Sequence, residues 1–348
     1  MVRLRKAGRE QSRFREPSAG ELALLLTIRS RSADLAHRGD SRVRLGIGDD
    51  CALLRPRAGE ELAVTTDLSI EGRHFRLDWH PPESVGHRTL ARGLSDLAAM
   101  GARPVAAFLS LGLPKELVVA SGDSRAWVDR FLDGLLKLAT EHDVPLAGGD
   151  LAESPVAVAD IVLTGSVPRG KALLRSGAEP GDRIYVTGVL GGAAAEFAAL
   201  SASPERFAAE TSATKHAPHL YPQPRVAQGM WLRKNGLASA AMDLSDGLST
   251  DLDHLCEESK VAAEIEAASL PIAPGAMLEM ALHGGEDYEL LFAAQKSAKV
   301  PRTIAGVPVT EIGRVLRRKA GRPRVTIVTE AGSQPLEPHG WEHFSVKS

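Results

Sequence analysis

The sequence predicts a mixed α/β protein of two domains. The chain has 348 residues, more than the roughly 250–300 at which a single hydrophobic core stops growing. Short apolar segments typical of strands alternate with longer segments of helical period, which favours a mixed α/β layer over an all-helical or all-β fold. Both halves of the chain also repeat one pattern, a strand followed by an aspartate-bearing turn and a helix, as two related folding units would.

The composition limits the possible functions. A hydrophobic content of 43% and a charged content of 25% are typical of a soluble globular protein. A net charge of −2 gives no general attraction for polyanions, so we expect no nucleic-acid partner. Cys51 and Cys256 support neither a disulfide framework nor a thiolate metal site. Without a membrane-length apolar run or a secretory signal, we expect no membrane association and a cytoplasmic location.

The N-terminal half is expected to contain a flexible basic tail over residues 1–18 and a domain over residues 19–167. The tail is charged and aperiodic. In the domain, apolar periodicity predicts helices over residues 21–36, 82–100 and 123–142. It predicts strands over residues 43–45, 52–54, 61–66, 105–113 and 156–167.

The second domain is expected over residues 168–348, after a boundary near Pro168. A turn-rich segment precedes a strand over residues 183–187, and an alanine-rich helix follows Gly191-Gly192. A strand over residues 238–242 leads to Asp243, and a helix begins just after Ser245, whose side chain could cap it. The remaining residues alternate between strands and turns.

The segment Leu45-Gly-Ile-Gly-Asp-Asp-Cys-Ala-Leu-Leu54 places two adjacent carboxylates on a glycine turn. Glycine lets a ligand approach the main chain closely, and adjacent carboxylates repel unless a cation or proton lies between them. Further aspartates lie at predicted strand ends, turns or helix edges. Each alone is better explained as a turn or cap residue, but together they favour a shared cation site. These carboxylates are Asp50, Asp67, Asp96, Asp150, Asp243 and Asp246.

Oxygen ligands of this kind suit Mg²⁺, which leaves coordination positions open for water and substrate phosphates. No histidine and cysteine set with metal-ligand spacing accompanies the aspartates, which argues against zinc. The chain has no P-loop and no protein-kinase signature, so an ATP enzyme would belong to another class. Arg175 and His74 could contact phosphate or be ordinary surface residues, and Gly191-Gly192 could cradle phosphate or form a plain turn. Trp341 could stack on a ligand ring or pack in the core.

The motifs together resemble those of the thiamine-monophosphate kinase family, in the aminoimidazole-ribonucleotide synthetase superfamily. They occur in the family's order over about residues 19–344. They are Gly46-Ile-Gly-Asp-Asp-Cys-Ala52, Thr65-Thr-Asp67 with Gly72-Arg-His74, Leu94-Ser-Asp-Leu-Ala-Ala-Met-Gly-Ala102, Gly148-Gly-Asp150, Thr187-Gly188, Met242-Asp-Leu-Ser-Asp-Gly-Leu248, Gly284-Gly-Glu-Asp-Tyr-Glu-Leu290 and Gly340-Trp-Glu-His-Phe344.

The resemblance implies transfer of the γ-phosphate of ATP to thiamine monophosphate. It also implies an N-terminal domain that binds ATP and Mg²⁺ and forms a dimer sheet with its copy, and a C-terminal domain that completes the substrate site. The attacking phosphate oxygen is already anionic near neutral pH, because its second ionisation lies at about 6. A general base is therefore unnecessary, and we expect direct in-line transfer.

The resemblance also implies roles for single residues. Several Mg²⁺ ions would be held by Asp50, Thr65, Thr66, Asp67, Asp96, Asp150, Asp243 and Asp246. The carboxylates expected to be catalytic are Asp50, Asp67, Asp96, Asp150 and Asp246. ATP would be contacted by Gly149, Asp150, Arg175 and Ser245, and thiamine monophosphate by His74, Glu286 and Trp341. The family often has a different aromatic residue at the position of Trp341, and its usual start lies later than the basic extension here.

Other functions remain open from the sequence alone. An ATP enzyme of the same superfamily could act on an amide or on a selenium or carbamoyl donor. The lack of a reactive cysteine or lysine near the N-terminus disfavours the selenium chemistry, and the Gly-Trp-Glu-His-Phe segment favours the thiamine substrate. A non-catalytic Mg-nucleotide binding module would bind ATP without turnover, and a structural protein with an acidic surface would show no cooperative metal binding.

Overall fold

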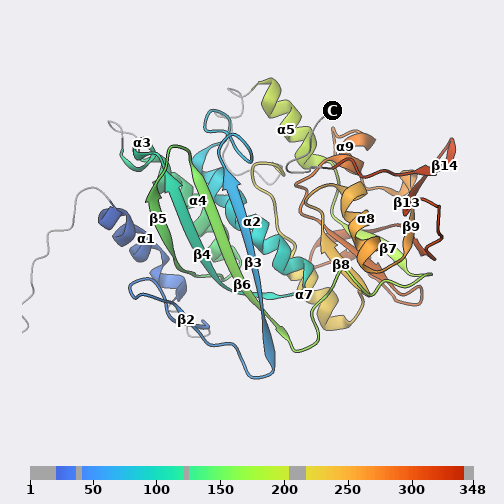
Figure 1. Cartoon of the computed structure of the whole chain (residues 1–348), viewed down its shortest axis with the longest axis horizontal. Coiled ribbons are helices and arrows are strands. Elements are labelled where there is room, and N and C mark those ends of the chain that lie inside the picture. The colour runs from blue at the N-terminus through green and yellow to red at the C-terminus, as the bar shows by residue number, and fades with distance from the viewer. Residues whose placement is uncertain (1–20, 37–40, 121–124, 204–216, 341–348) are drawn as a thin grey trace, which may run out of the picture.

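A computed structural model describes residues 21–36, 41–120, 125–203 and 217–340, and Figure 1 shows two β-sheets with helices packed on them. A four-stranded sheet lies in the N-terminal half and an eight-stranded sheet in the C-terminal half. A short antiparallel pair, β1 (Val43–Leu45) and β2 (Leu53–Leu54), lies outside both. This arrangement confirms the predicted mixed α/β class. The predicted basic tail over residues 1–18 and Trp341 lie outside the described residues.

The N-terminal sheet has the strand order β3-β6-β4-β5, so β3 and β5 are its edges. The pairs β3–β6 and β4–β6 are antiparallel, and β4–β5 is parallel. Its strands are β3 (Glu60–Ile70), β4 (Arg103–Leu113), β5 (Leu146–Glu153) and β6 (Val158–Pro168). The helices of this half are α1 (Glu21–Ala36), α2 (Pro82–Ala99), α3 (Lys115–Val118) and α4 (Trp127–Glu141).

Helix α2 is the central helix of the molecule, because it packs against the N-terminal sheet, α4 and elements of the C-terminal half. Its leucines Leu90, Leu94 and Leu97 are buried, as their helical spacing predicts. Gly86 lets α2 approach α4 closely, since a Cβ there would lie 1.9 Å from the carbonyl oxygen of Phe131. The helix therefore holds its polar residues in a fixed position between the two halves.

The C-terminal sheet has the strand order β14-β13-β9-β12-β7-β10-β8, with β11 paired to β12. Its strands are β7 (Arg183–Thr187), β8 (Ala240–Asp243), β9 (Ala262–Glu266), β10 (Leu290–Ala294), β11 (Thr303–Ile304), β12 (Val307–Leu316), β13 (Val325–Thr329) and β14 (Gly332–Pro335). The helices are α5 (Gly192–Ala202), α7 (Val226–Asn235), α8 (Leu248–Glu258), the 3-10 turn η1 (Ala267–Ser269) and α9 (Leu278–His283). No helix of the described ranges is both long and apolar enough to cross a membrane.

Three local expectations are wrong. The strand expected to end before Asp67 continues to Ile70, so Asp67 lies inside β3. Asp150 lies inside β5 and not in a turn, because its segment pairs in parallel with β4. Ser245 does not cap α8. The helix begins after Gly247, and the Asp251 carboxylate accepts the amide protons of Asp246 and Gly247, each at 3.1 Å.

Candidate active site

A cavity of about 430 Å³ lies between α2 and β3 on one side and α5 with loops of the C-terminal half on the other. The site residues predicted from the sequence that line it are Asp67, His74, Asp96, Asp243, Ser245, Asp246 and Glu286. The other lining residues are Arg73, Arg92, Ala193, Ala194, Phe197, His219, Gly285 and Tyr288. Residues far apart in the sequence therefore meet at this cavity.

Three aspartates of the cavity come from three different elements. Asp67 projects from β3, Asp96 from α2, and Asp243 from the end of β8. Thr65 donates a hydrogen bond to Asp96, and Ser95 Oγ donates to Asp243 Oδ2 at 2.7 Å. The hydroxyl donors of β3 and α2 thus orient two carboxylates toward the same space.

Burial sets the electrostatics of these aspartates. Burial, with Asp243 and Asp67 close by, raises the pKa of Asp96 to about 7. Burial also raises the pKa of Asp243, and it raises the pKa of Asp67 despite the nearby Arg92. Charged carboxylates that are both dehydrated and mutually repelling gain from a bound cation.

The donor set of the cavity fits a hard cation. Its candidate ligands are carboxylate oxygens, with the Thr65 hydroxyl adjacent, and Mg²⁺ prefers oxygen ligands. Among the residues that the structure describes, no three histidine, cysteine or acidic side chains converge closely enough to hold a metal on their own. Mg²⁺ commonly uses one or two protein carboxylates and completes its shell with water and substrate phosphates. The arrangement therefore suits an ion that binds together with a phosphate ligand.

Glu286 faces the cavity from the loop between α9 and β10, with its backbone in the left-handed region at φ 67°. Arg88 donates to its Oε1 atom at 2.7 Å, and His219 Nδ1 lies 3.1 Å from its Oε2 atom. Burial alone would raise the pKa of Glu286, but Arg88 and His219 outweigh it and lower the pKa well below the ordinary value. The carboxylate is therefore ionised at neutral pH.

Asp50, Gly149 and Asp150 line a second cavity of about 850 Å³, next to α1 and the glycine turn. Gly149 has φ +147°, and a Cβ there would lie 1.8 Å from the carbonyl oxygen of Leu109. Only glycine fits this part of β5, and its close approach to β4 gives a structural reason for the Gly-Gly-Asp segment. The single chain thus does not bring these three residues together with Asp67, Asp96 and Asp243.

Two other predicted residues, Thr66 and Arg175, lie apart from the cavity that Asp67, Asp96 and Asp243 line. Successive side chains of a strand point to opposite faces, so Thr66 lies on the other face of β3 from Thr65 and Asp67. There its hydroxyl donates to Asp160 Oδ1 at 3.0 Å. Arg175 is exposed on the loop before β7, where its positive charge offsets part of the rise in the pKa values of Asp96 and Asp243.

The glycine pair Gly191-Gly192 does not offer an open phosphate cradle. The Asp287 carboxylate accepts the amide protons of Gly191 at 2.6 Å and Ala193 at 3.1 Å, at the beginning of α5. An internal anion thus occupies the place that a phosphate would take at this helix N-terminus. Of the two interpretations of this segment, the structure favours the structural turn.

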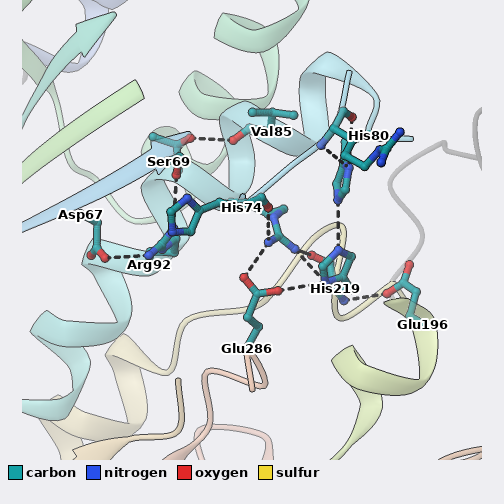
Figure 2. Close-up of polar contacts among 12 residues, drawn as sticks. Asp67, Ser69, His74, His80, Val85, Arg92, Glu196, His219 and Glu286 are labelled. Atoms are coloured by element: carbon teal, nitrogen blue, oxygen red, sulfur yellow. Dashed lines mark hydrogen bonds and ion pairs between the residues drawn. The ribbon is translucent and has the colours of Figure 1, made fainter. Parts of the chain in front are cut away.

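Sequence patterns did not predict Arg88, Arg92 and His219 as site residues. Arg92 lies 3.3 Å from Asp67 and, with it, faces the cavity (Figure 2). One signal for Arg92 was present in the sequence, because Arg92 and Asp96 share the side of α2 that lies off its apolar face. His219 comes from an irregular proline-rich segment, where no periodicity indicates its partners.

Comparisons with known proteins place the chain in a class. The family model "AIR synthase related protein, N-terminal domain" matches residues 48–167, and "AIR synthase related protein, C-terminal domain" matches residues 179–326. These two matches define the chain as an AIR synthase related protein.

Within that class, the chain belongs to the thiamine-monophosphate kinase family. The thiamine-monophosphate kinase of Escherichia coli strain K12 is 38% identical over 341 residues, covering 94% of this chain and 99% of the relative. That of Bacillus subtilis strain 168 is 33% identical over 317 residues, covering 87% and 94%. The family recognised from the motifs is confirmed, as is the enzyme class, a thiamine-phosphate kinase.

Solved structures agree with this assignment. A thiamine-monophosphate kinase from Stenotrophomonas maltophilia K279a has a TM-score of 0.74 and 38% identity, covering 90% of this chain and 98% of its own. The structure of AaThiL complexed with AMPPCP and TMP has a TM-score of 0.70 and 32% identity, covering 93% and 97%. A hydrogenase maturation protein HypE complex with ATP, at 19% identity and a TM-score of 0.69, shares the fold.

Proposed function

We propose that this chain transfers the γ-phosphate of ATP to thiamine monophosphate by direct in-line displacement, in a site that uses several Mg²⁺ ions. The convergence of Asp67, Asp96 and Asp243 in one cavity with basic side chains is the observation that carries the proposal. The complex of AaThiL with AMPPCP and TMP supports it, since that relative is 32% identical over nearly the whole chain.

The residues of the cavity supply binding and charge compensation. Asp67, Asp96, Asp243 and Asp246, with the Thr65 hydroxyl, would hold Mg²⁺, which when bound would neutralise the phosphoryl oxygens and align the reacting groups. Arg92 and Arg175 add positive charge near these carboxylates. The attacking oxygen is a phosphate oxygen that is already anionic near pH 7. No protein side chain therefore needs to remove a proton from it.

The two cavities suggest how the other predicted residues take part. We propose that the N-terminal domain, residues 19–167, binds ATP and Mg²⁺, with Asp50, Thr66, Gly149 and Asp150 joining the site when the enzyme is assembled. The C-terminal domain, residues 168–348, completes the site with Ser245, Glu286 and Trp341, and His74 joins from the facing loop of the N-terminal domain. A cytoplasmic location belongs to the same proposal.

The assembled form proposed is a homodimer. Strand β3 is an edge of its sheet, and Leu62, Val64 and Leu68 of one face are 45%, 65% and 45% exposed. An exposed apolar row of this kind is unusual for a monomer and marks a surface that another protein covers. The unpaired backbone groups of an edge strand are in addition available to a strand of a second copy. A second copy of the chain would cover this face, and pairing at the β3 edge would form the predicted shared sheet.

The direct test is product formation by the purified chain. With ATP, Mg²⁺ and thiamine monophosphate, coupled ADP release and mass detection should show thiamine diphosphate. Asp50→Ala should remove most of this activity if Asp50 joins the metal site. Metal-dependent ATP binding without any thiamine diphosphate would contradict the proposed acceptor and favour another substrate of the superfamily.

A further inference from the structure

Two buried histidines, His80 and His219, lie beside the cavity and contact each other. Each is 3% exposed, and their Nε2 atoms are 3.1 Å apart (Figure 2). They come from distant parts of the chain, since His80 precedes α2 and His219 lies between α5 and α7. A buried polar pair of this kind needs every ring nitrogen to have a partner.

The contacts of the pair define one direction for its hydrogen bonds. The amide of Arg76 donates to His80 Nδ1 at 3.1 Å, and the carbonyl oxygen of Arg76 lies 3.2 Å from the same nitrogen. From the amide contact we assign the His80 proton to Nε2. His80 Nε2 then donates to His219 Nε2, and the His219 proton lies on Nδ1. His219 Nδ1 in turn donates to Glu286 Oε2 at 3.1 Å. The chain of donors thus ends on the ionised carboxylate that faces the cavity.

Arg88 and Glu286 both contact His219 Nδ1, and the negative charge of Glu286 decides the direction. The Arg88 Nη1 atom carries two protons, donates one to the carbonyl oxygen of His219 and lies 2.9 Å from His219 Nδ1. If His219 Nδ1 carried no proton, its lone pair would face the negative Glu286 oxygen at 3.1 Å, which is repulsive. Burial and the positive charge of Arg88 lower the pKa of both histidines, that of His80 to about 3. Both rings are therefore neutral at pH 7, as the hydrogen-bond chain requires.

The backbone around Glu286 and His219 is held independently of the two rings. The Glu286 amide donates to the carbonyl oxygen of Ser245 at 2.8 Å. The His219 amide donates to Glu196 Oε2 at 2.6 Å, as Figure 2 shows. Replacing a histidine ring would therefore remove the orientation of the Glu286 side chain while leaving these backbone contacts in place.

We propose that His80 and His219 are positioning residues that, with Arg88, orient the Glu286 carboxylate toward the acceptor substrate. The inference rests on the proposed function. An oriented carboxylate suits a substrate part that carries positive charge or donates N–H groups. In thiamine monophosphate the thiazolium ring carries positive charge, and the aminopyrimidine ring donates N–H groups. The histidine pair thus acts on recognition of the acceptor and not on ATP or on the reacting phosphates.

The first test is the protonation pattern of the two rings in the full-length chain. Nitrogen NMR of histidine-labelled protein should show His80 protonated on Nε2 and His219 protonated on Nδ1 at pH 7, with assignment by His80→Gln and His219→Asn. The opposite tautomers, or a charged ring in either residue, would overturn the proposal. This readout does not require turnover, so it decides the positioning role even if the chain fails to phosphorylate thiamine monophosphate.

The second test separates positioning from structural support. His219→Phe should raise the KM for thiamine monophosphate by about tenfold or more, as expected for loss of a hydrogen bond to a charged group, with the KM for ATP unchanged. His219→Asn keeps a donor at the position of Nδ1 and should restore most of the affinity. In a Glu286→Gln background, His219→Phe should not raise the KM for thiamine monophosphate further, because the carboxylate that His219 orients is already absent.

His87→Phe is the matched control. His87 is a buried histidine of α2 that contacts the carbonyl oxygen of Pro222 at 2.7 Å, in the same proline-rich segment as His219. It should lower thermal stability without changing the KM for thiamine monophosphate. Equal effects of His87→Phe and His219→Phe on this KM, or additive effects of His219→Phe and Glu286→Gln, would overturn the positioning role. Absence of thiamine diphosphate with the unmodified chain would instead contradict the proposed function.

Discussion

At the scale of single residues, the neighbours of a buried side chain decide whether it carries charge. Asp96 and Glu286 face the same cavity, yet the pKa of Asp96 is raised and that of Glu286 is lowered. The difference comes from their neighbours, since Asp96 faces other carboxylates whereas Glu286 faces Arg88. One cavity thus combines a group of carboxylates that favours a bound cation with the Glu286 carboxylate, whose charge Arg88 already neutralises.

A buried neutral histidine should make stability depend on pH. Burial lowers the pKa of His87 to about 4, against about 6.5 in the unfolded chain. Between these values the unfolded state binds more protons, so this contribution to stability is complete above pH 6.5 and is lost as the pH falls toward 4. His87→Gln keeps a donor for Pro222 and removes the titration.

Denaturant unfolding at pH 7 and pH 5 measures this contribution. The free energy of unfolding of the unmodified chain should fall by about 2 kcal/mol more than that of His87→Gln between the two pH values. The comparison with the variant cancels other groups that titrate in this range. Equal pH dependence of the two proteins would mean that His87 is not held neutral by the fold.

The sequence predicts the acidic site residues better than the basic ones. Asp67, Asp96 and Asp243 stand in recognisable short motifs, and the structure brings all three to one cavity. Arg88 and His219 stand in no such motif. Their roles depend on contacts over 131 and 198 positions, Arg88 to His219 and Arg88 to Glu286, which no local pattern encodes.

At the scale of elements, strand register determines which predicted ligands can meet. Helical and strand periodicity predicted most elements of the N-terminal half to within a few residues. It did not predict that β3 continues past Asp67 or that the Gly-Gly-Asp segment is a strand. Both depend on pairing, with β6 in one case and β4 in the other, and pairing partners lie far apart in the sequence.

Gly149 gives a test of the pairing between β5 and β4. Gly149→Ala would place a Cβ 1.8 Å from a backbone oxygen at φ +147°, and we expect it to destabilise the fold by about 3 kcal/mol or more. Gly170→Ala is the matched control, because Gly170 has φ +66° with open space around it. Gly170→Ala should lower the free energy of unfolding by about 1–2 kcal/mol. Thermal or denaturant unfolding measures both, and similar costs would argue against the tight strand contact.

At the scale of the whole molecule, the site exists because α2 connects two sheets. The N-terminal sheet supplies Asp67 through β3, and the C-terminal sheet supplies Asp243 through β8. The single chain keeps the second cavity, with Asp50 and Asp150, apart from the first. The proposed homodimer is the assembly in which the remaining predicted residues would complete the site.

The exposed face of β3 gives a test of the assembly. Val64→Lys puts a charge in the centre of the apolar row, where a dimer would have to bury it without a partner, and should shift the protein toward monomer in sedimentation experiments. Val189→Lys changes an equally apolar residue, 44% exposed, on a loop of the other half, and should leave the mass unchanged. A monomeric unmodified chain, or a dimer that survives Val64→Lys, would place the interface elsewhere.

The stereochemical course at phosphorus tests the proposed chemistry most directly. The enzyme would be given ATP with a chiral γ-phosphate, together with Mg²⁺ and thiamine monophosphate, and the configuration of the phosphate transferred to thiamine diphosphate would be determined. A single in-line displacement predicts inversion. Retention would contradict the account, because it requires two displacements and therefore a phosphorylated enzyme intermediate.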